Sequence, residues 1–128
     1  MARMATCCPD KPHRALGLCR RCYMNKWQSE HPEKVHVRNQ KAYYALKAEM
    51  IAAYGGQCEC CGEMEEVFLS LEHKNGGGNA HRREAGSGYT IWWELKRLGW
   101  PKEEYTILCH NCQRGRLRPD GCPHKRVN

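Results

Sequence analysis

The sequence predicts a small zinc-dependent protein of the α+β class, and three features lead to this prediction. The chain carries ten cysteines and seven histidines in 128 residues but a single phenylalanine, so metal ligands are plentiful and large core residues are scarce. The cysteines recur as C-x2-C pairs, the spacing at which one turn directs two sulfurs to one ion. Stretches typical of strands alternate with helical patterns in the second half of the chain. We therefore expect zinc to contribute folding free energy that a small core cannot supply.

Composition also bears on location and partners. The first residues, MARMATCC, lack the apolar stretch of a signal peptide, and no apolar run is long enough to cross a bilayer. These observations predict a cytoplasmic protein with no membrane partner, in which reducing conditions keep the cysteines available as metal ligands. The formal charge is +7, and thiolates at two zinc sites would lower it to about +4. A moderately basic protein suits a polyanion such as nucleic acid.

Residues 1–31 are expected to form an N-terminal zinc-binding module. Cys19 and Cys22 make a C-x2-C pair, and two further ligands complete a tetrahedral site. Three residues compete for those two places: Cys7, Cys8 and His13. We take Cys7 as the spare residue, which gives the predicted ligands Cys8, His13, Cys19 and Cys22. The alternative is a set of buried free thiols.

Two more C-x2-C motifs predict a four-cysteine zinc site within residues 57–128. One lies in CECC and the other in LCHNC. Together they are a strong zinc signal, whereas one alone is only suggestive. The predicted ligands are Cys58, Cys61, Cys109 and Cys112, with Cys60 left over. Because the ion would join the two ends of this segment, everything between them becomes a loop closed by metal.

A long helix, from about residue 32 to residue 54, is predicted within a connector that spans residues 32–56. Pro32 suits a first helical turn, and Gly55 and Gly56 end the pattern. One face is apolar and carries Val35, Tyr43, Leu46, Met50 and Tyr54. The opposite face carries three basic residues at helical spacing: Lys34, Arg38 and Lys41. They form either a solvated face or, as we predict, a stripe that contacts nucleic-acid phosphates.

The last segment alternates strands and helices. EVFLSLEH predicts a strand at residues 66–73, and EYTILC predicts a second strand at residues 104–109. Between them we expect a glycine-rich loop up to Gly88 and a short helix that begins at Thr90 and stops at Gly99. A further helix starts with HNCQRGRLR. Within the short helix we assign four residues to the core rather than to base stacking: Trp92, Trp93, Leu95 and Leu98.

Four stretches together resemble one known family. They are YGGQCECCGE, LSLEHKNGGGNAHR, ILCHNCQ and CPH, and with the N-terminal GLCRRCY they cover most of the chain. Their order and spacing resemble the HNH endonucleases, in particular the small zinc-stapled type of phages and mobile elements. The resemblance implies a ββα-metal core behind the N-terminal zinc module and the connecting helix. It also implies metal-dependent cleavage of phosphodiester bonds in double-stranded DNA, in the host cytoplasm if the protein is phage-encoded.

The resemblance assigns roles to individual residues. His73 matches the general base, a role that suits a histidine near neutral pH. Glu72 and Gln113 match two ligands of the catalytic cation, expected to be Mg²⁺ or another divalent ion. The family usually has Asp at the first position and His or Asn at the second. Because Glu and Gln are one methylene longer than Asp and Asn, a weakened or inactive relative is the alternative.

Several polar residues near the predicted base remain to be placed. Arg82 and Arg83 follow the glycines and are predicted to contact phosphate, for which a guanidinium offers two parallel donors. His81 has three interpretations: a phosphate contact, a metal ligand or a surface histidine. Cys122 and His124 match a family element whose role does not follow from the residues themselves.

The resulting functional prediction is an HNH endonuclease that acts on DNA and contains two structural zinc ions and one catalytic cation. A homodimer would supply two active sites for cutting both strands, although nothing in the sequence establishes one. The rival is a zinc-ribbon DNA-binding protein that does not hydrolyse DNA. His73 distinguishes the two, because a protein that only binds DNA needs no base beside a metal ligand.

Overall fold

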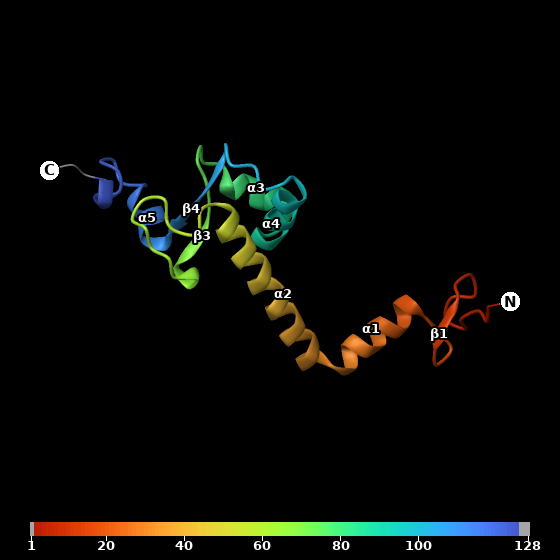
Figure 1. The fold of residues 1–128 in the computed structure, drawn as a ribbon. Helices are drawn as coiled ribbons and strands as arrows, with labels where there is room; N and C mark the ends of the chain where they lie inside the picture. The colour runs from red at the N-terminus through yellow and green to blue at the C-terminus, as the bar shows by residue number, and fades with distance from the viewer. Residues whose placement is uncertain (1, 126–128) are drawn as a thin grey trace. The chain divides into compact units, whose positions relative to one another are not determined.

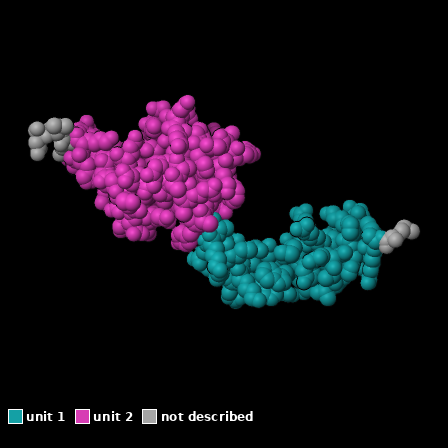
Figure 2. Space-filling model, viewed as in Figure 1, with its two compact units in different colours: residues 1–42 teal, residues 43–128 magenta. Residues whose placement is uncertain are grey.

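The computed structural model describes residues 2–125 of the chain. The protein folds as two compact units, residues 1–42 and residues 43–128 (Figure 2). The boundary falls inside a long helix rather than at residue 31 or residue 56, so the predicted connector is divided between the units. Each unit contains its own cysteine groups.

Unit 1 opens with a small hairpin. β1 (His13–Ala15) pairs antiparallel with β2 (Leu18–Cys19). The two residues of the turn, Leu16 and Gly17, have φ values of 53° and 76°. Positive φ at both central positions is the geometry of the tight hairpin turn whose twist matches that of the strands. The turn brings the C-x2-C motif back towards the N-terminal cysteines.

A helix follows the hairpin, but the unit has almost no hydrophobic core. α1 (Arg20–Glu30) begins directly after β2 and contains no buried residue. Among the described residues of unit 1, the buried apolar ones are Ala5 and Cys19. Burial of two small side chains stabilises a fold by only a few kcal/mol, so the hairpin and α1 need another source of stability.

The predicted long helix is α2 (Pro32–Ala53) (Figure 1). It ends close to the predicted position, because two glycines with positive φ follow it, Gly55 and Gly56. The part of α2 that belongs to unit 2 buries three side chains: Leu46, Met50 and Ile51.

The centre of unit 2 is an antiparallel pair of strands. β3 (Leu69–His73) pairs with β4 (Tyr105–Cys109), so that Leu69 faces Cys109 and His73 faces Tyr105. The first residues of the predicted strand form a 3-10 turn instead. α5 (His110–Gly115) starts where β4 ends and lies beside both strands (Figure 1). This register puts cysteines at one end of the strand pair and His73 at the other.

Part of the stretch that was expected to be a glycine-rich loop is helical. α3 (Gly78–Ala85) follows two glycines with positive φ, and α4 (Gly88–Arg97) lies next to it (Figure 1). The prediction missed α3 because the sequence does not distinguish glycines that form a turn, such as Gly76 and Gly77, from a glycine that begins a helix, such as Gly78. α4 begins before Thr90, since the Ser87 side chain accepts the hydrogen bond from the Thr90 N–H and caps the helix.

The core of unit 2 lies between α2, α4 and the strand pair. Its largest members include Met50, Leu69, Trp92, Ile107 and Leu108. Of the four residues of the short helix assigned to the core, Trp92 and Leu95 are buried, whereas Trp93 is 48% exposed and Leu98 is 61% exposed. The difference arises because α4 packs on the core along one side only.

Among residues 2–125, no helix combines the length and the apolar character that crossing a membrane requires.

Candidate functional site

The first cysteine group lies in unit 1, between the hairpin and the start of α1. The ligand atoms of four residues lie within 4.8 Å of one another: Cys7, Cys8, Cys19 and Cys22. His13 is outside this group, because its Nε2 accepts a hydrogen bond from the Gly17 N–H at 3.1 Å. The structure thus differs from the predicted ligand set: Cys7, expected to be the spare residue, lies with the other three cysteines, and His13, expected to be a ligand, supports the hairpin turn.

Backbone N–H groups point at the sulfurs of this group. The Cys19 N–H donates to Cys7 Sγ at 3.2 Å. Hydrogen bonding from the Cys22 backbone N–H lowers the pKa of Cys19 to about 7, against the opposing effect of burial. Zinc binds thiolates, and N–H donors stabilise the thiolate form. Within this group the backbone therefore favours the thiolate form of Cys19 in particular.

The second group lies in unit 2 and unites the four cysteines that the spacing predicted: Cys58, Cys61, Cys109 and Cys112. The Cys61 and Cys109 sulfurs are 3.6 Å apart. Burial acts to raise the pKa of Cys58, but hydrogen bonds from three backbone N–H groups outweigh it and lower that pKa to about 6. An ion at this group would join the turn after α2 to the junction of β4 and α5.

A third group adjoins the second. It consists of Cys60, Cys112, Cys122 and His124, whose ligand atoms also lie within 4.8 Å of one another. Cys60, which the spacing left over, is therefore a member of a cluster, and Cys112 belongs to two clusters. Cys122 is 7% exposed. The CPH stretch that contains Cys122 and His124 thus lies against the cysteines of unit 2.

The spacing in all three groups fits tetrahedral zinc coordination. Zinc–sulfur bonds of about 2.3 Å place the sulfurs of a tetrahedron about 3.8 Å apart. The sulfur–sulfur distances given by the structure are 3.6 Å for two pairs and 3.9 Å for a third. Every cysteine is free of disulfide bonds, and all ten fall within the three groups. Each group could therefore hold a zinc ion.

A separate polar groove lies in unit 2, lined by residues of β3, α3 and α5. Its walls include Glu72 and His73 from β3, Arg82 and Arg83 from α3, Gln113 from α5, and Arg116, which follows α5 directly. The predicted base, both predicted cation ligands and the two arginines predicted to contact phosphate thus share one groove. Three glycines at positions 76–78 form another part of the wall.

A chain of hydrogen bonds holds the His73 ring. His73 Nε2 lies 2.9 Å from His81 Nδ1, and His81 Nε2 lies 3.0 Å from Glu94 Oε2 on α4. Because the Glu94 carboxylate can only accept, His81 Nε2–H donates to it, and His81 Nδ1 is left to accept a hydrogen bond from the N–H of His73 Nε2. The lone pair of His73 is then on Nδ1. A Cβ on Gly78 would lie 3.2 Å from this atom, so the glycine leaves room beside it.

The surroundings of His73 favour its neutral form. Burial is the largest cause that lowers the pKa of His73 below 6.5, and the neighbouring His81 lowers it further, while Glu72 opposes both. Tyr105, the cross-strand partner, packs against the ring with centroids 5.0 Å apart. A neutral imidazole with a free nitrogen can accept a proton near pH 7.

The two predicted cation ligands, Glu72 on β3 and Gln113 on α5, line the same groove, and each has a protein partner. Glu72 Oε1 lies 3.2 Å from Arg116 Nη1. The Gln113 amide nitrogen donates to Ser70 Oγ, which leaves the amide oxygen available as a ligand. Carboxylate and amide oxygens are suitable donors for a hard divalent cation. The donor set therefore fits such an ion, with Arg116 competing for Glu72.

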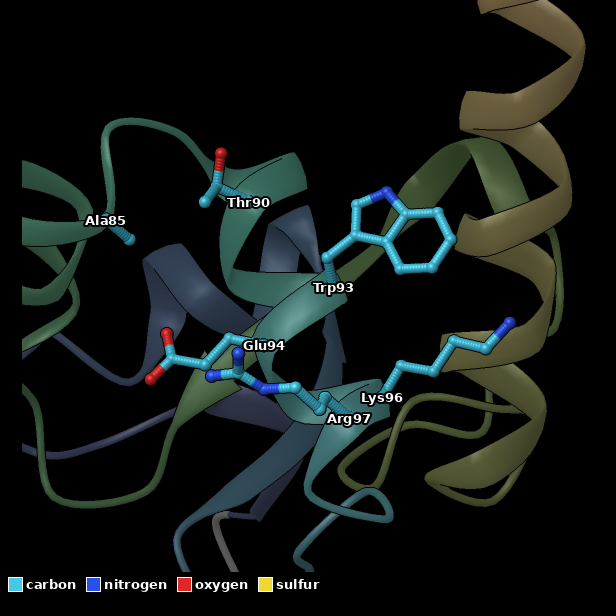
Figure 3. Close-up of a pocket in the computed structure, with 6 residues that line it drawn as sticks. All are labelled: Ala85, Thr90, Trp93, Glu94, Lys96 and Arg97. Atoms are coloured by element: carbon cyan, nitrogen blue, oxygen red, sulfur yellow. The ribbon is translucent and has the colours of Figure 1, made fainter.

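The outer side of α4 forms a shallow hollow (Figure 3). Glu94 and Arg97 project away from α2 there, whereas the Trp93 indole extends toward α2. The Lys96 Nζ lies 5.2 Å from the centroid of a Trp93 ring and pairs with Glu49 of α2 at 2.9 Å. Trp93 is therefore a surface residue beneath a lysine, which corrects its assignment to the core.

The three basic residues predicted to contact phosphate on α2 lie in unit 1. Lys34, Arg38 and Lys41 are exposed and line one shallow depression together with Val37. Their common face follows from helical spacing.

Several residues of the groove were not identified from the sequence. Arg116 had a usable signal, because it follows Gln113 by three residues and so shares a face of α5. Glu94 had no such signal in the sequence, since its contact with His81 depends on how α3 and α4 pack. His81 is placed behind His73, as its hydrogen-bond partner, which none of its three interpretations included.

Comparisons of the chain with models of protein families, with curated proteins and with solved structures found no match in any of the three.

Proposed function

We propose that this protein is a metal-dependent HNH-type endonuclease that hydrolyses phosphodiester bonds of double-stranded DNA. One observation carries the proposal: a neutral, oriented His73 shares a polar groove with two oxygen donors and with three arginines. A base, a cation site and positive charge are what phosphodiester hydrolysis needs. The order of β3, β4 and α5, with a cysteine group at their junction, agrees with the ββα-metal arrangement that the resemblance implies.

In this proposal His73 takes the proton of the attacking water. Its Nδ1 accepts that proton, while Nε2 remains bonded to His81, so the ring cannot rotate away. Glu94 stabilises the positive charge that the histidine pair gains at that step. His81 and Glu94 are therefore positioning residues, and His73 is the catalytic residue.

Glu72 and Gln113 would hold the divalent cation, which supplies stabilisation of negative charge on the phosphorane and on the leaving oxygen. Arg116 neutralises Glu72 in the absence of that ion and can turn to a phosphate oxygen when the ion takes the carboxylate. Arg82 and Arg83 on α3 hold the phosphates on either side of the bond that is cut.

The test is cleavage of supercoiled plasmid with Mg²⁺ or Mn²⁺, with a chelator as control. We expect cleavage by the native protein and its loss in His73→Ala, with DNA affinity unchanged within a few fold because phosphate contacts dominate binding. Undiminished cleavage by His73→Ala would contradict the assignment of the base.

A second candidate function is DNA binding without hydrolysis, and the Glu72–Arg116 pair favours it. An ion pair at 3.2 Å already satisfies the carboxylate, and a cation must displace the guanidinium. Binding of DNA without cleavage under Mg²⁺, Mn²⁺, Co²⁺ or Ni²⁺ would support this candidate over the nuclease.

A further inference from the structure

The third cysteine group has the dimensions of a metal site. Cys60 Sγ and Cys122 Sγ are 3.6 Å apart, and the His124 Nδ1 lies 3.5 Å from Cys122 Sγ and 3.2 Å from Cys112 Sγ. A tetrahedron with zinc–sulfur bonds of about 2.3 Å and zinc–nitrogen bonds of about 2.0 Å has sulfur–nitrogen edges of about 3.5 Å. Three sulfurs and one imidazole nitrogen thus surround a space that suits one ion.

This group cannot be separated from the second group, because both contain Cys112. Cys112 is 1% exposed, and its sulfur lies among the ligands of both groups. A thiolate has more than one lone pair and can bind two metal ions at once. If Cys112 served only one ion, the other group would keep three protein ligands.

The chain is shaped to bring the C-terminal segment to these cysteines. A Cβ on Gly115, the last residue of α5, would lie 3.0 Å from Cys122 Sγ and 3.1 Å from Pro123 Cδ. Both contacts would be tighter than nine in ten Cβ contacts in proteins, and Gly115 has no positive φ that would otherwise require glycine. The absence of a side chain at position 115 therefore permits the close approach of Cys122.

The segment between α5 and Cys122 buries little apolar surface of its own. Leu117, the one large apolar side chain between α5 and Cys122, is 79% exposed. The hydrogen bonds of the segment that involve Arg118, Gly121 and Lys125 are local ones. At its start Arg116 contacts Glu72 and the His73 carbonyl, and at its end Cys122 and His124 contact Cys60 and Cys112.

We propose that unit 2 holds two zinc ions that share one thiolate, with Cys112 as the bridge. One ion binds Cys58, Cys61, Cys109 and Cys112, and the second binds Cys60, Cys112, Cys122 and His124. Six thiolate charges against four positive charges leave a net charge of −2. With the group of unit 1, the chain binds three zinc ions and uses every cysteine.

Zinc analysis of the full chain, after dialysis against a weak chelator, tests the number of ions. We expect three zinc ions per chain in the native protein and two in Cys122→Ser and Cys60→Ser. Two in the native protein, or a Cys60–Cys122 disulfide found by mass spectrometry under reducing purification, would overturn the proposal.

A glycine pair tests the same site without removing a ligand. Gly115→Ala is expected to force Cys122 to move by a few tenths of an ångström and to lower the retention of the third zinc ion, whereas Gly88→Ala, where a Cβ meets nothing within 4 Å, is expected to retain three. This comparison remains informative if a cysteine variant fails to fold. Three zinc ions in Gly115→Ala would contradict the role of the close approach and with it the site.

Cadmium-113 NMR tests the bridge. In protein loaded with cadmium-113 we expect three signals, two of which split one another through the shared sulfur. The splitting is expected to disappear in Cys122→Ser, where one partner ion is lost. Three unsplit signals in the native protein would overturn the bridging role of Cys112.

Discussion

At the scale of single residues, the position of Gly78 beside His73 determines which ring nitrogen can act as a base. The hydrogen bond to His81 occupies Nε2, and Nδ1 lies where a side chain at position 78 would project. The missing Cβ therefore has a chemical consequence beyond backbone freedom, because water and a scissile phosphate can approach Nδ1 only if that space stays open.

Gly78→Ala tests this arrangement. A methyl group 3.2 Å from Nδ1 is expected to lower the rate of plasmid cleavage by roughly 10²-fold, the order of a general-base contribution, with DNA affinity unchanged. The control is Gly88→Ala, which adds a methyl group elsewhere on the groove wall without a neighbour and should cleave at the native rate. Equal rates for the two variants would mean that Nδ1 is not the base.

If His73 is the base, as proposed, its lowered pKa sets the pH dependence of cleavage. The neutral ring is active, so activity is present above the folded-state pKa and is lost as the pH falls through it, at a value below 6.5. His81→Asn removes a neighbour that lowers this pKa, so the acidic limb of kcat/KM is expected to move toward higher pH. Burial of the His73 ring, the larger cause of its lowered pKa, is retained in this variant. A limb that stays in place, or moves to lower pH, would contradict this account of His73.

At the scale of elements, α2 presents three basic side chains on the part that belongs to unit 1. A helix with a basic stripe contacts successive phosphates, and each contact contributes a release of counterions. A solvated face would contribute none. The two interpretations of Lys34, Arg38 and Lys41 therefore differ in a measurable quantity.

Replacing Lys34, Arg38 and Lys41 together with Ala should weaken DNA binding and reduce the slope of log K against log salt by up to about three. The control exchanges the same residues as Lys34→Arg, Arg38→Lys and Lys41→Arg, which keeps the charges and should keep the slope. Fluorescence titrations at several salt concentrations measure both. An unchanged slope in the triple Ala variant would identify a solvated face.

α3 was not predicted from the sequence because the glycines at its start are typical of a loop. The two glycines before it, Gly76 and Gly77, supply the positive φ values of the turn after β3, and α3 then carries Arg82 and Arg83 to the groove and His81 to the ring of His73. The helix turns what looked like a flexible loop into a fixed support for the ring of His73.

At the scale of the whole molecule, the two units should differ in their dependence on zinc. Unit 1 buries only Ala5 and Cys19 among its described apolar residues, whereas unit 2 has a core built from α2, α4 and the strand pair. Metal binding and folding are coupled when the core is small.

Stepwise addition of a strong chelator is therefore expected to unfold unit 1 at a lower chelator concentration than unit 2. Limited proteolysis with mass spectrometry locates the first cuts, which should fall within residues 2–42. Cys7→Ser should reproduce the effect without chelator, whereas His13→Asn should leave the zinc of unit 1 in place. A loss of zinc in His13→Asn alone would restore histidine as the ligand.

The sequence by itself determined the features that depend on neighbours along the chain. The C-x2-C spacing indicated Cys58, Cys61, Cys109 and Cys112, and periodicity with flanking glycines indicated α2. The same holds for Glu72 and His73 at the end of a strand. A spacing or a period is a local geometric constraint, so these patterns retain their meaning whatever the rest of the chain does.

The tertiary structure decided the features that depend on contacts between distant residues. Cys60 meets Cys122 across 62 positions, and His81 meets Glu94 across 13. No pattern along the sequence predicts these contacts. The first forms only when the C-terminal segment packs beside α5, and the second only when α3 packs against α4. The presence of Cys7 and not His13 in the cysteine group has the same origin. The Gly17 N–H of the hairpin turn donates a hydrogen bond to the His13 nitrogen, and the Cys19 N–H donates to Cys7 Sγ, the fourth sulfur of the group.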